Sequence, residues 1–267
     1  MLPSRYFIDL TQPEIAAQFK QNPLVILPAG SVEQHGPHLP TGTDTFASTV
    51  IGHAVAERMD GLVLPATPFG VTPMHMPFEG TITLTPETYM RVVIETCAST
   101  AKHGAKSLLI LNWHEGNIPS LAIAAETLHR EHDMTVLTVQ ACYVAEELYG
   151  QSCNGLTHGG EIEALAVLAH RADLVHLDRI DYSSDHAHGH KMDKLRRTRS
   201  YQPVLTDIRS IAPTGWFGSP QHATAEKGAR MLAAIADAIA KEATEIFRQL
   251  DGVQGGAAEI KQLRQVG

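Results

Sequence analysis

Short, continuously apolar runs alternate along this chain with longer segments whose apolar residues recur at helical spacing. The clearest of the longer segments follows Thr85, which predicts a helix N-cap, and Pro86, which suits the first helical position. Its apolar residues, Tyr89 among them, recur at helical intervals, and Gly104 predicts its end. The other predicted helices span residues 45–59, 118–132, 161–171 and 224–250, and the predicted strands span residues 24–28, 62–64, 106–111 and 135–139.

This alternation of strands and helices predicts an α/β fold. Strands that are apolar throughout are typical of a mostly parallel sheet covered by helices on both faces. The length of 267 residues favours one large domain over residues 1–267. Two segments fall outside the pattern: residues 182–199 predict an excursion from the core, and residues 252–267 predict a loosely held tail.

Charge and cysteine content exclude several classes of protein. The chain has 21 basic and 29 acidic residues, for a net charge of -8, which argues against a nucleic-acid-binding face and, less strongly, against an anionic membrane surface. No run approaches the roughly 18 apolar residues of a membrane span. Cys97, Cys142 and Cys153 share no metal-type spacing, and no secretory signal pattern begins the chain. We therefore expect a reduced, cytoplasmic protein.

The loop after the first predicted strand is rich in metal-ligand side chains, in a chain with 15 histidines. It carries Glu33, His35, His38 and Asp44. Glu33 and His35 are two residues apart, so in an extended segment they project to the same side. Asp44 stands at the start of the next helix, where a carboxylate is favoured electrostatically, although such a residue can also serve simply as an N-cap.

Two later segments carry the same residue types. His114, Glu115 and Asn117 follow the third predicted strand, and His158 and Glu161 open a later helix. Because sites in parallel sheets gather at the carboxyl ends of the strands, we expect the three segments to converge at one edge of the sheet.

The charges of such a cluster point to bound cations. Glu33, Asp44 and Glu161 would bring three negative charges together beside the imidazoles of His35 and His114, and without a cation these carboxylates would repel one another and take up protons. Two bound divalent ions would change the net charge of the cluster from three negative charges to one positive charge. A bound hydroxide then makes it neutral, because a metal lowers the pKa of water from about 15.7 to about 7. Mixed carboxylate and imidazole donors suit Zn, Mn or Fe.

At this point the residues resemble a known family. The segment LPAGSVEQHGPHLPTGTD resembles the signature loop of the creatininase family, and FEGTITL, NWHEGN, HGGEIE and GWFGSP with its following AxxEKG resemble the family's later motifs in the same order. Only residues 182–203 match poorly. The resemblance implies a single three-layer α/β/α domain with a mostly parallel central sheet. It also implies a two-metal centre, amidohydrolase chemistry on a small molecule and a homo-oligomer, often a hexamer.

The resemblance also implies roles for individual residues. Glu33 and His114 would bind one metal, His35 would bind the other, and Asp44 would bridge the two. His158 matches the family's catalytic histidine, which carries a proton to the leaving nitrogen.

One expected ligand departs from creatininase itself. That enzyme has a glutamate two residues after the histidine of the NWHEGN segment, where this chain has Gly116. Many other members use a glutamate of the HxGE segment instead, so we assign the last metal ligand to Glu161. Creatininase also carries a glycine-rich insert in place of VTPMHMPFEGT. These differences favour a member other than classical creatininase and argue against creatinine as the substrate.

The implied reaction is cleavage of a C–N amide bond, in a cyclic amide or a formamide, by a hydroxide that two metals activate. Family relatives include a peptidase-like member and one that acts on a cyclic keto-sugar, so a short peptide or a cyclic diketone stays open. A non-catalytic metal-binding relative is a third alternative, against which the intact ligand set and His158 argue. A purely structural oligomer is the fourth, and it predicts no metal.

Four further residues are candidates for substrate contact: His75, Glu115, Asn117 and Trp216. Each also has a structural alternative; His75 can be an ordinary surface histidine, and Trp216 can pack in a subunit interface. The run DHAHGH at residues 185–190 could bind a metal, and a solvated or substrate-gating loop is its alternative.

Overall fold

The computed structural model describes residues 2–153, 155–183, 186–196 and 204–265. Its centre is a parallel sheet with the strand order β2-β1-β3-β4. The strands are β1 (Leu24–Ala29), β2 (Leu62–Val63), β3 (Ser107–Asn112) and β4 (Thr135–Gln140). The predicted strands are thus confirmed, with ends that differ by one residue, as is usual where pairing stops.

Helices cover both faces of this sheet. The helices are α1 (Gln12–Gln21), α2 (Thr43–Met59), α3 (Pro86–Lys102), α4 (Ile118–His132), α5 (Ala141–Tyr149), α6 (Glu161–Arg171), α7 (Ala187–Arg196) and α8 (Ala225–Gln265). Alternate residues of β1 point to opposite faces: Ile26 packs in a core with α2, α5, α6 and α8, and Leu27 packs in a second core with α1, α3 and α4. The expected three-layer α/β/α fold is confirmed.

Local sequence explains where several helices begin. The hydroxyl of Thr85 accepts a hydrogen bond from the Thr88 backbone N–H at 3.3 Å, and Pro86 is the first residue of α3, as predicted. Helix α1 begins with a capping box in which Thr11 and Glu14 bond to each other's backbone. This helix, α5 and α7 were not expected from the sequence. They are short, and tertiary packing rather than a long periodic pattern stabilises helices of this length.

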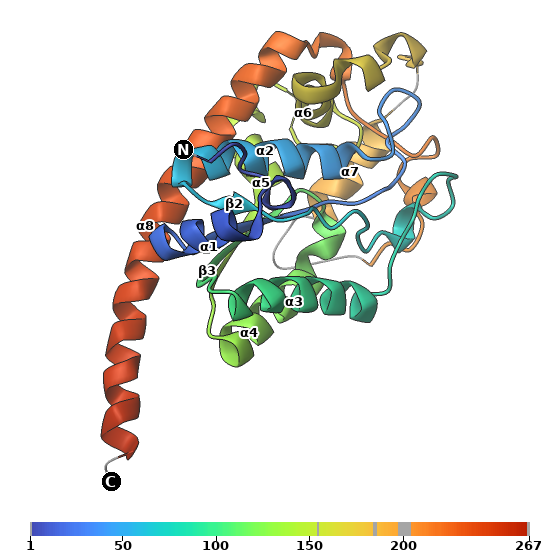
Figure 1. Cartoon of the computed structure of the whole chain (residues 1–267). Coiled ribbons are helices and arrows are strands. Elements are labelled where there is room, and N and C mark those ends of the chain that lie inside the picture. The colour runs from blue at the N-terminus through green and yellow to red at the C-terminus, as the bar shows by residue number, and fades with distance from the viewer. Residues whose placement is uncertain (1, 154, 184–185, 197–203, 266–267) are drawn as a thin grey trace.

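Two segments differ from expectation. Helix α7 forms inside the polar stretch at 182–199, of which residues 184–185 and 197–199 lie outside the described part of the chain. Helix α8 does not end near residue 250 but continues to Gln265, past the rest of the fold (Figure 1). Among the described residues, none of the helices combines the length and the apolarity needed to cross a bilayer.

The sheet positions the loops that matter for function. Strands β1 and β3 pair in register along their full length, so Ala29 and Asn112 lie side by side at their carboxyl ends. The loops leaving these two residues carry Glu33 and His114. The chain after β1 then approaches α2 closely, because a side chain at Gly30 would come within 2.6 Å of the backbone of Asp44 and Thr45.

We predict that Gly30→Ala destabilises the fold. Its methyl group would meet the Thr45 backbone nitrogen at 2.5 Å, a contact that only backbone movement can relieve. Overpacking of this kind costs about 1–3 kcal/mol, measured as the free energy of unfolding in urea. Gly42→Ala is the matched control in the same loop, since its methyl group would meet only the Phe46 ring, at 3.3 Å. Equal unfolding midpoints for the two variants would contradict this account of the close approach.

Candidate metal centre and active site

Asp44 is the centre of a buried cluster of carboxylates and imidazoles. It lies in the first turn of α2 and is 2% exposed. Its Oδ2 lies 3.1 Å from His114 Nδ1, and its Oδ1 lies 3.3 Å from His35 Nε2. The Ser31 hydroxyl donates a hydrogen bond to Oδ2 at 2.8 Å, which fixes the carboxylate between the two imidazoles. The two oxygens of Asp44 therefore face two different histidines.

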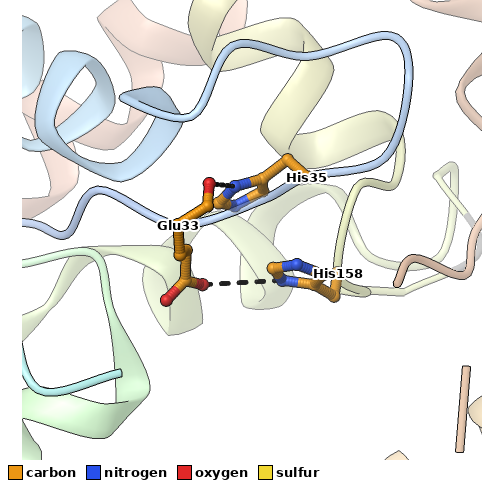
Figure 2. Close-up of side chains that lie close together, drawn as sticks. All are labelled: Glu33, His35 and His158. Atoms are coloured by element: carbon orange, nitrogen blue, oxygen red, sulfur yellow. Dashed lines mark hydrogen bonds and ion pairs between the residues drawn. The ribbon is translucent and has the colours of Figure 1, made fainter. Parts of the chain in front are cut away.

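Backbone carbonyls orient both of these histidines. His35 Nδ1 lies 3.0 Å from the Glu33 carbonyl oxygen (Figure 2), and His114 Nε2 lies 3.1 Å from the Val71 carbonyl oxygen. In each ring one nitrogen donates to the backbone, so the lone pair of the other nitrogen points at Asp44. This is the arrangement in which a metal-binding histidine is held by a second hydrogen bond.

Glu33 joins the cluster on the His114 side. Its Oε2 lies 3.3 Å from His114 Nδ1 and accepts a short hydrogen bond from the Thr72 hydroxyl. Its Oε1 lies 3.7 Å from the nearest nitrogen of each of two more histidines, His75 and His158. Figure 2 shows the Glu33 side chain pointing toward His158 while its main chain contacts His35.

Glu163, and not Glu161, supplies the carboxylate on the His35 side. Its Oε2 lies 3.6 Å from His35 Nε2 and accepts a hydrogen bond from the Gly159 N–H at 2.6 Å. Glu161 instead lies 3.5 Å from the Lys227 Nζ of α8. The structure thus places Glu163, and not the predicted Glu161, beside His35. Residues two apart on a helix project about 200° apart, so only one of the two glutamates can face the cluster.

His158 and His75 stack beside the cluster. The His158 ring centroid lies 4.3 Å from that of His35 and 4.3 Å from that of His75. His158 Nε2 lies 2.7 Å from the Gln34 carbonyl oxygen, and the Gln34 side-chain nitrogen lies 2.9 Å from His75 Nδ1. The backbone and the side chain of Gln34 thus orient one ring each. Gln34 was not singled out in the sequence, where it is only the residue between two predicted ligands.

Burial and charge shift the titration of the cluster strongly. Burial opposes ionisation of Asp44, but the neighbouring His35 and His114 outweigh it and lower the pKa of its carboxyl. Burial acts to lower the pKa of both histidines, yet the adjacent carboxylates raise it, to about 10 for His35 and about 9 for His114. Burial raises the pKa of Glu163 to about 8. Burial, with the charges of His35 and His75, lowers the pKa of His158 well below its usual value.

The donor set fits divalent metal ions. Within each of three triads the donor atoms lie within 4.8 Å of one another: Glu33, His35 and His158; Glu33, Asp44 and His114; and His35, Asp44 and Glu163. Two of these buried atoms, His35 Nε2 and Asp44 Oδ1, have no hydrogen-bond partner among the described residues. Buried polar atoms are nearly always satisfied, and a cation held between them would satisfy both. Oxygen and imidazole donors are those of Zn, Mn and Fe sites.

The four candidate substrate contacts fall in different environments. His75 is buried within the cluster, and Trp216 lines a cavity of about 500 Å³ together with Gln34. Glu115 is half-buried at the start of a short 3₁₀ helix, Glu115–Asn117. Asn117 is fully buried, and its amide bonds to the Val71 N–H at 2.9 Å and the Gly30 carbonyl at 2.9 Å, so it holds loops together.

The histidine-rich run does not form a metal cluster among its described residues, which are 186–190. His186 instead packs edge-on against Trp216, with ring centroids 4.4 Å apart. His38 packs against the same indole at 4.7 Å, and burial lowers the pKa of His38 to about 4. Two histidines therefore hold the Trp216 ring, a contact between distant segments that sequence spacing does not reveal.

Comparisons with known proteins identify relatives over most of this chain. The family model described as Creatininase, creatinine amidohydrolase, matches residues 8–243. A mycofactocin precursor peptide peptidase of Mycobacterium ulcerans (strain Agy99) is 31% identical over 224 residues, 80% of this chain and 82% of the relative. A creatinine amidohydrolase of Pseudomonas putida is 29% identical over 270 residues, 91% of this chain and 98% of the relative. A solved structure of a mutant creatininase of Zn-Zn type superposes with a TM-score of 0.75 at 27% identity, covering 92% of this chain and 99% of that one.

We predict that protein stripped of metal with a chelator loses stability as the pH rises from 6.5 to 9. The raised pKa values of His35 and His114 contribute stability that is present below about 6.5 and is lost as the pH passes 9 to 10. The raised pKa of Glu163 acts in the same direction up to about pH 8. The lowered pKa values of Asp44 and His158 affect stability only below this window.

The measurement is the melting temperature across this pH range, with metal-loaded protein as the control. Metal takes the place of the protons on the two imidazoles, so the loaded protein should show a flatter curve. A stripped protein whose melting temperature rises between pH 6.5 and 9 would contradict the charge arrangement.

Proposed function

The chain belongs to the creatininase family, and we propose that it is a metal-dependent amidohydrolase that holds two divalent ions and cleaves a C–N amide bond of a small molecule. The observation that carries the proposal is the position of Asp44. Its two oxygens face separate donor groups, Glu33 with His114 on one side and His35 with Glu163 on the other. A carboxylate placed in this way is suited to bridge two ions.

The net charge of the cluster favours two bound ions over one. Glu33, Asp44 and Glu163 bring three negative charges when ionised, and the two ligand histidines are neutral when they bind metal. One divalent ion would leave a net negative charge buried in the protein, whereas two leave a small positive charge. A positive site suits a reaction in which negative charge develops on a carbonyl oxygen. The donors are those of Zn, Mn or Fe.

Bound there, the ions would supply an activated water and polarise the carbonyl group of the substrate. The chain's own residues would hold and move the proton. His158 Nε2 donates to the Gln34 carbonyl, so Nδ1 carries the lone pair that faces Glu33 Oε1 at 3.7 Å. Its lowered pKa keeps this nitrogen free to accept a proton, which it would then pass to the departing nitrogen.

A cyclic amide or a formamide is the bond that we propose for cleavage. The cavity of about 500 Å³ next to Gln34 suits a small molecule. Hydrolysis of a short peptide is the second candidate, and the 31% identity to a named peptide peptidase is the observation that favours it. Both candidates break a C–N bond at a carbonyl carbon, so they make the same demands on the cluster.

We also propose a homo-oligomer, with a hexamer as the expected form, in the cytoplasm. Strand β4 is an edge strand among the described residues. Beside it, a cavity of about 210 Å³ is lined mostly by apolar residues of β4, α5 and α8, including the exposed Leu148 and Ile246, together with Glu147 and Glu242. Contact between copies would cover such a surface. The three cysteines are free and buried, which supports a reducing compartment.

We predict that Glu163→Gln lowers the metal content from two ions per chain toward one and removes most of the activity. The amide keeps the shape of the side chain but cannot supply the negative charge that balances the second ion. Glu161→Gln is the matched control, two residues away and paired with Lys227, and it should keep both ions. Elemental analysis after dialysis measures the difference. Loss of metal in Glu161→Gln, with retention in Glu163→Gln, would restore the assignment made from the sequence.

We predict that His158→Gln lowers kcat about 10²- to 10⁴-fold, the usual contribution of a proton-transferring side chain, while both metal ions stay bound. Steady-state kinetics and elemental analysis on the same preparation measure the two effects. Loss of one ion in this variant would instead make His158 a metal ligand, since its Nδ1 also lies within 4.8 Å of donor atoms of Glu33 and His35.

A further inference from the structure

The cavity next to the cluster has aromatic walls and one cationic side chain. Trp216 and Phe78 supply the aromatic surface, and among the described residues Arg179 is the only basic one that lines it. Gln34 lines this cavity and also contacts the cluster, since its side-chain nitrogen lies 2.9 Å from His75 Nδ1 and 3.1 Å from His158 Nε2. A molecule in this cavity is thus separated from the cluster histidines by one side chain.

Arg179 lacks the ion pair that its sequence neighbours would allow. Two other arginines with an aspartate two residues away form that pair: Arg171 with Asp173 at 2.9 Å and Arg209 with Asp207 at 2.6 Å. Asp181 stands at the same spacing from Arg179, but its carboxylate accepts hydrogen bonds from the N–H and the hydroxyl of Ser183, at 2.9 and 2.6 Å. In the described part of the chain, no carboxylate forms an ion pair with the Arg179 guanidinium.

The backbone fixes Arg179 relative to the metal loop. It ends the 3₁₀ helix Leu177–Arg179, and its N–H bonds to the His176 carbonyl at 3.0 Å. The His176 N–H in turn bonds at 2.9 Å to the carbonyl of His38, in the loop that carries Glu33 and His35. The next residue, Ile180, is buried. The backbone of Arg179 is therefore anchored, and its side chain is exposed to solvent at the cavity.

We propose that Arg179 binds the carboxylate of the substrate, so that the enzyme acts on amides that carry one free carboxylate next to an apolar or aromatic group. This inference rests on the proposed amidohydrolase function. A guanidinium binds a carboxylate through two parallel hydrogen bonds, which gives both orientation and affinity. Glu79 and Asp181 also line the cavity, and their negative charges disfavour a second carboxylate on the substrate. The substrate class is therefore a monoanionic N-acyl amino acid or a related amide.

N-formyl-phenylalanine is a probe of this class. The cavity offers apolar surface from Trp216 and Phe78 for its ring and the Arg179 side chain for its carboxylate. In the reaction, the oxygen of water bonds to the formyl carbon and the C–N bond breaks with its electron pair on nitrogen. The nitrogen takes up a proton, which gives formate and phenylalanine. The matched neutral probe is N-formyl-phenylalaninamide, which has the same scissile bond and ring but no carboxylate.

The kinetic test compares the two probes on wild type, Arg179→Gln and Arg171→Gln. Wild type should have a higher kcat/KM for N-formyl-phenylalanine than for the neutral probe. Arg179→Gln should lower kcat/KM for N-formyl-phenylalanine about 10- to 100-fold, mainly by raising KM, and should have little effect on kcat/KM for the neutral probe. Arg171→Gln removes a cation that is paired with Asp173 and should change neither value. Equal losses on both probes, or none on the carboxylate probe, would overturn the role of Arg179.

A binding test separates this inference from the proposed function. Calorimetry measures the affinity of metal-loaded protein for 3-phenylpropanoate and for 3-phenyl-1-propanol, neither of which has a bond to hydrolyse. The inference predicts that wild type binds 3-phenylpropanoate more tightly than 3-phenyl-1-propanol and that Arg179→Gln removes this difference. If this result is found but no amide is hydrolysed, the carboxylate site is supported and the amidohydrolase function is contradicted. Equal binding of 3-phenylpropanoate to wild type and Arg179→Gln would overturn the inference, whether or not amides are hydrolysed.

Discussion

Three carboxylates buried around two histidines are the constraint on which this structure depends. Glu33, Asp44 and Glu163 lie within ion-pair distance of His35 or His114, shielded from water. Like charges at this separation repel strongly when no solvent screens them, so the cluster needs protons or metal ions. The shifted pKa values of the imidazoles and of Glu163 express that need. Bound metal ions would satisfy the same need.

The rest of the fold holds this cluster in place. Paired β1 and β3 bring two loops to one edge of the sheet, and Gly30 allows α2 to approach so that Asp44 can lie between them. Backbone carbonyls, not other side chains, orient both ligand histidines. Rigid support of this kind keeps donor atoms in position before an ion arrives, which is what a metal site requires.

Much of this could be predicted from the sequence, for a physical reason. The strands are apolar throughout because both faces are covered, so their positions and parallel arrangement were predictable. The residues that the first loop brings to the cluster were also predictable, because Glu33, His35 and Asp44 lie within one short patterned segment. The direction of side chains could not be predicted: Glu161 and Glu163 are two residues apart, and the packing of α6 against α8 places Glu163, and not the predicted Glu161, beside His35. The burial of Asn117 and the aromatic contacts of Trp216 likewise depend on tertiary packing.

The most direct test of the two-ion account is a crystal structure of metal-loaded protein with anomalous data collected at the absorption edge of the bound metal. The account predicts two anomalous peaks separated by the Asp44 carboxylate, one beside Glu33 and His114 and the other beside His35 and Glu163. A single peak, or a pair in which Glu161 replaces Glu163, would contradict it.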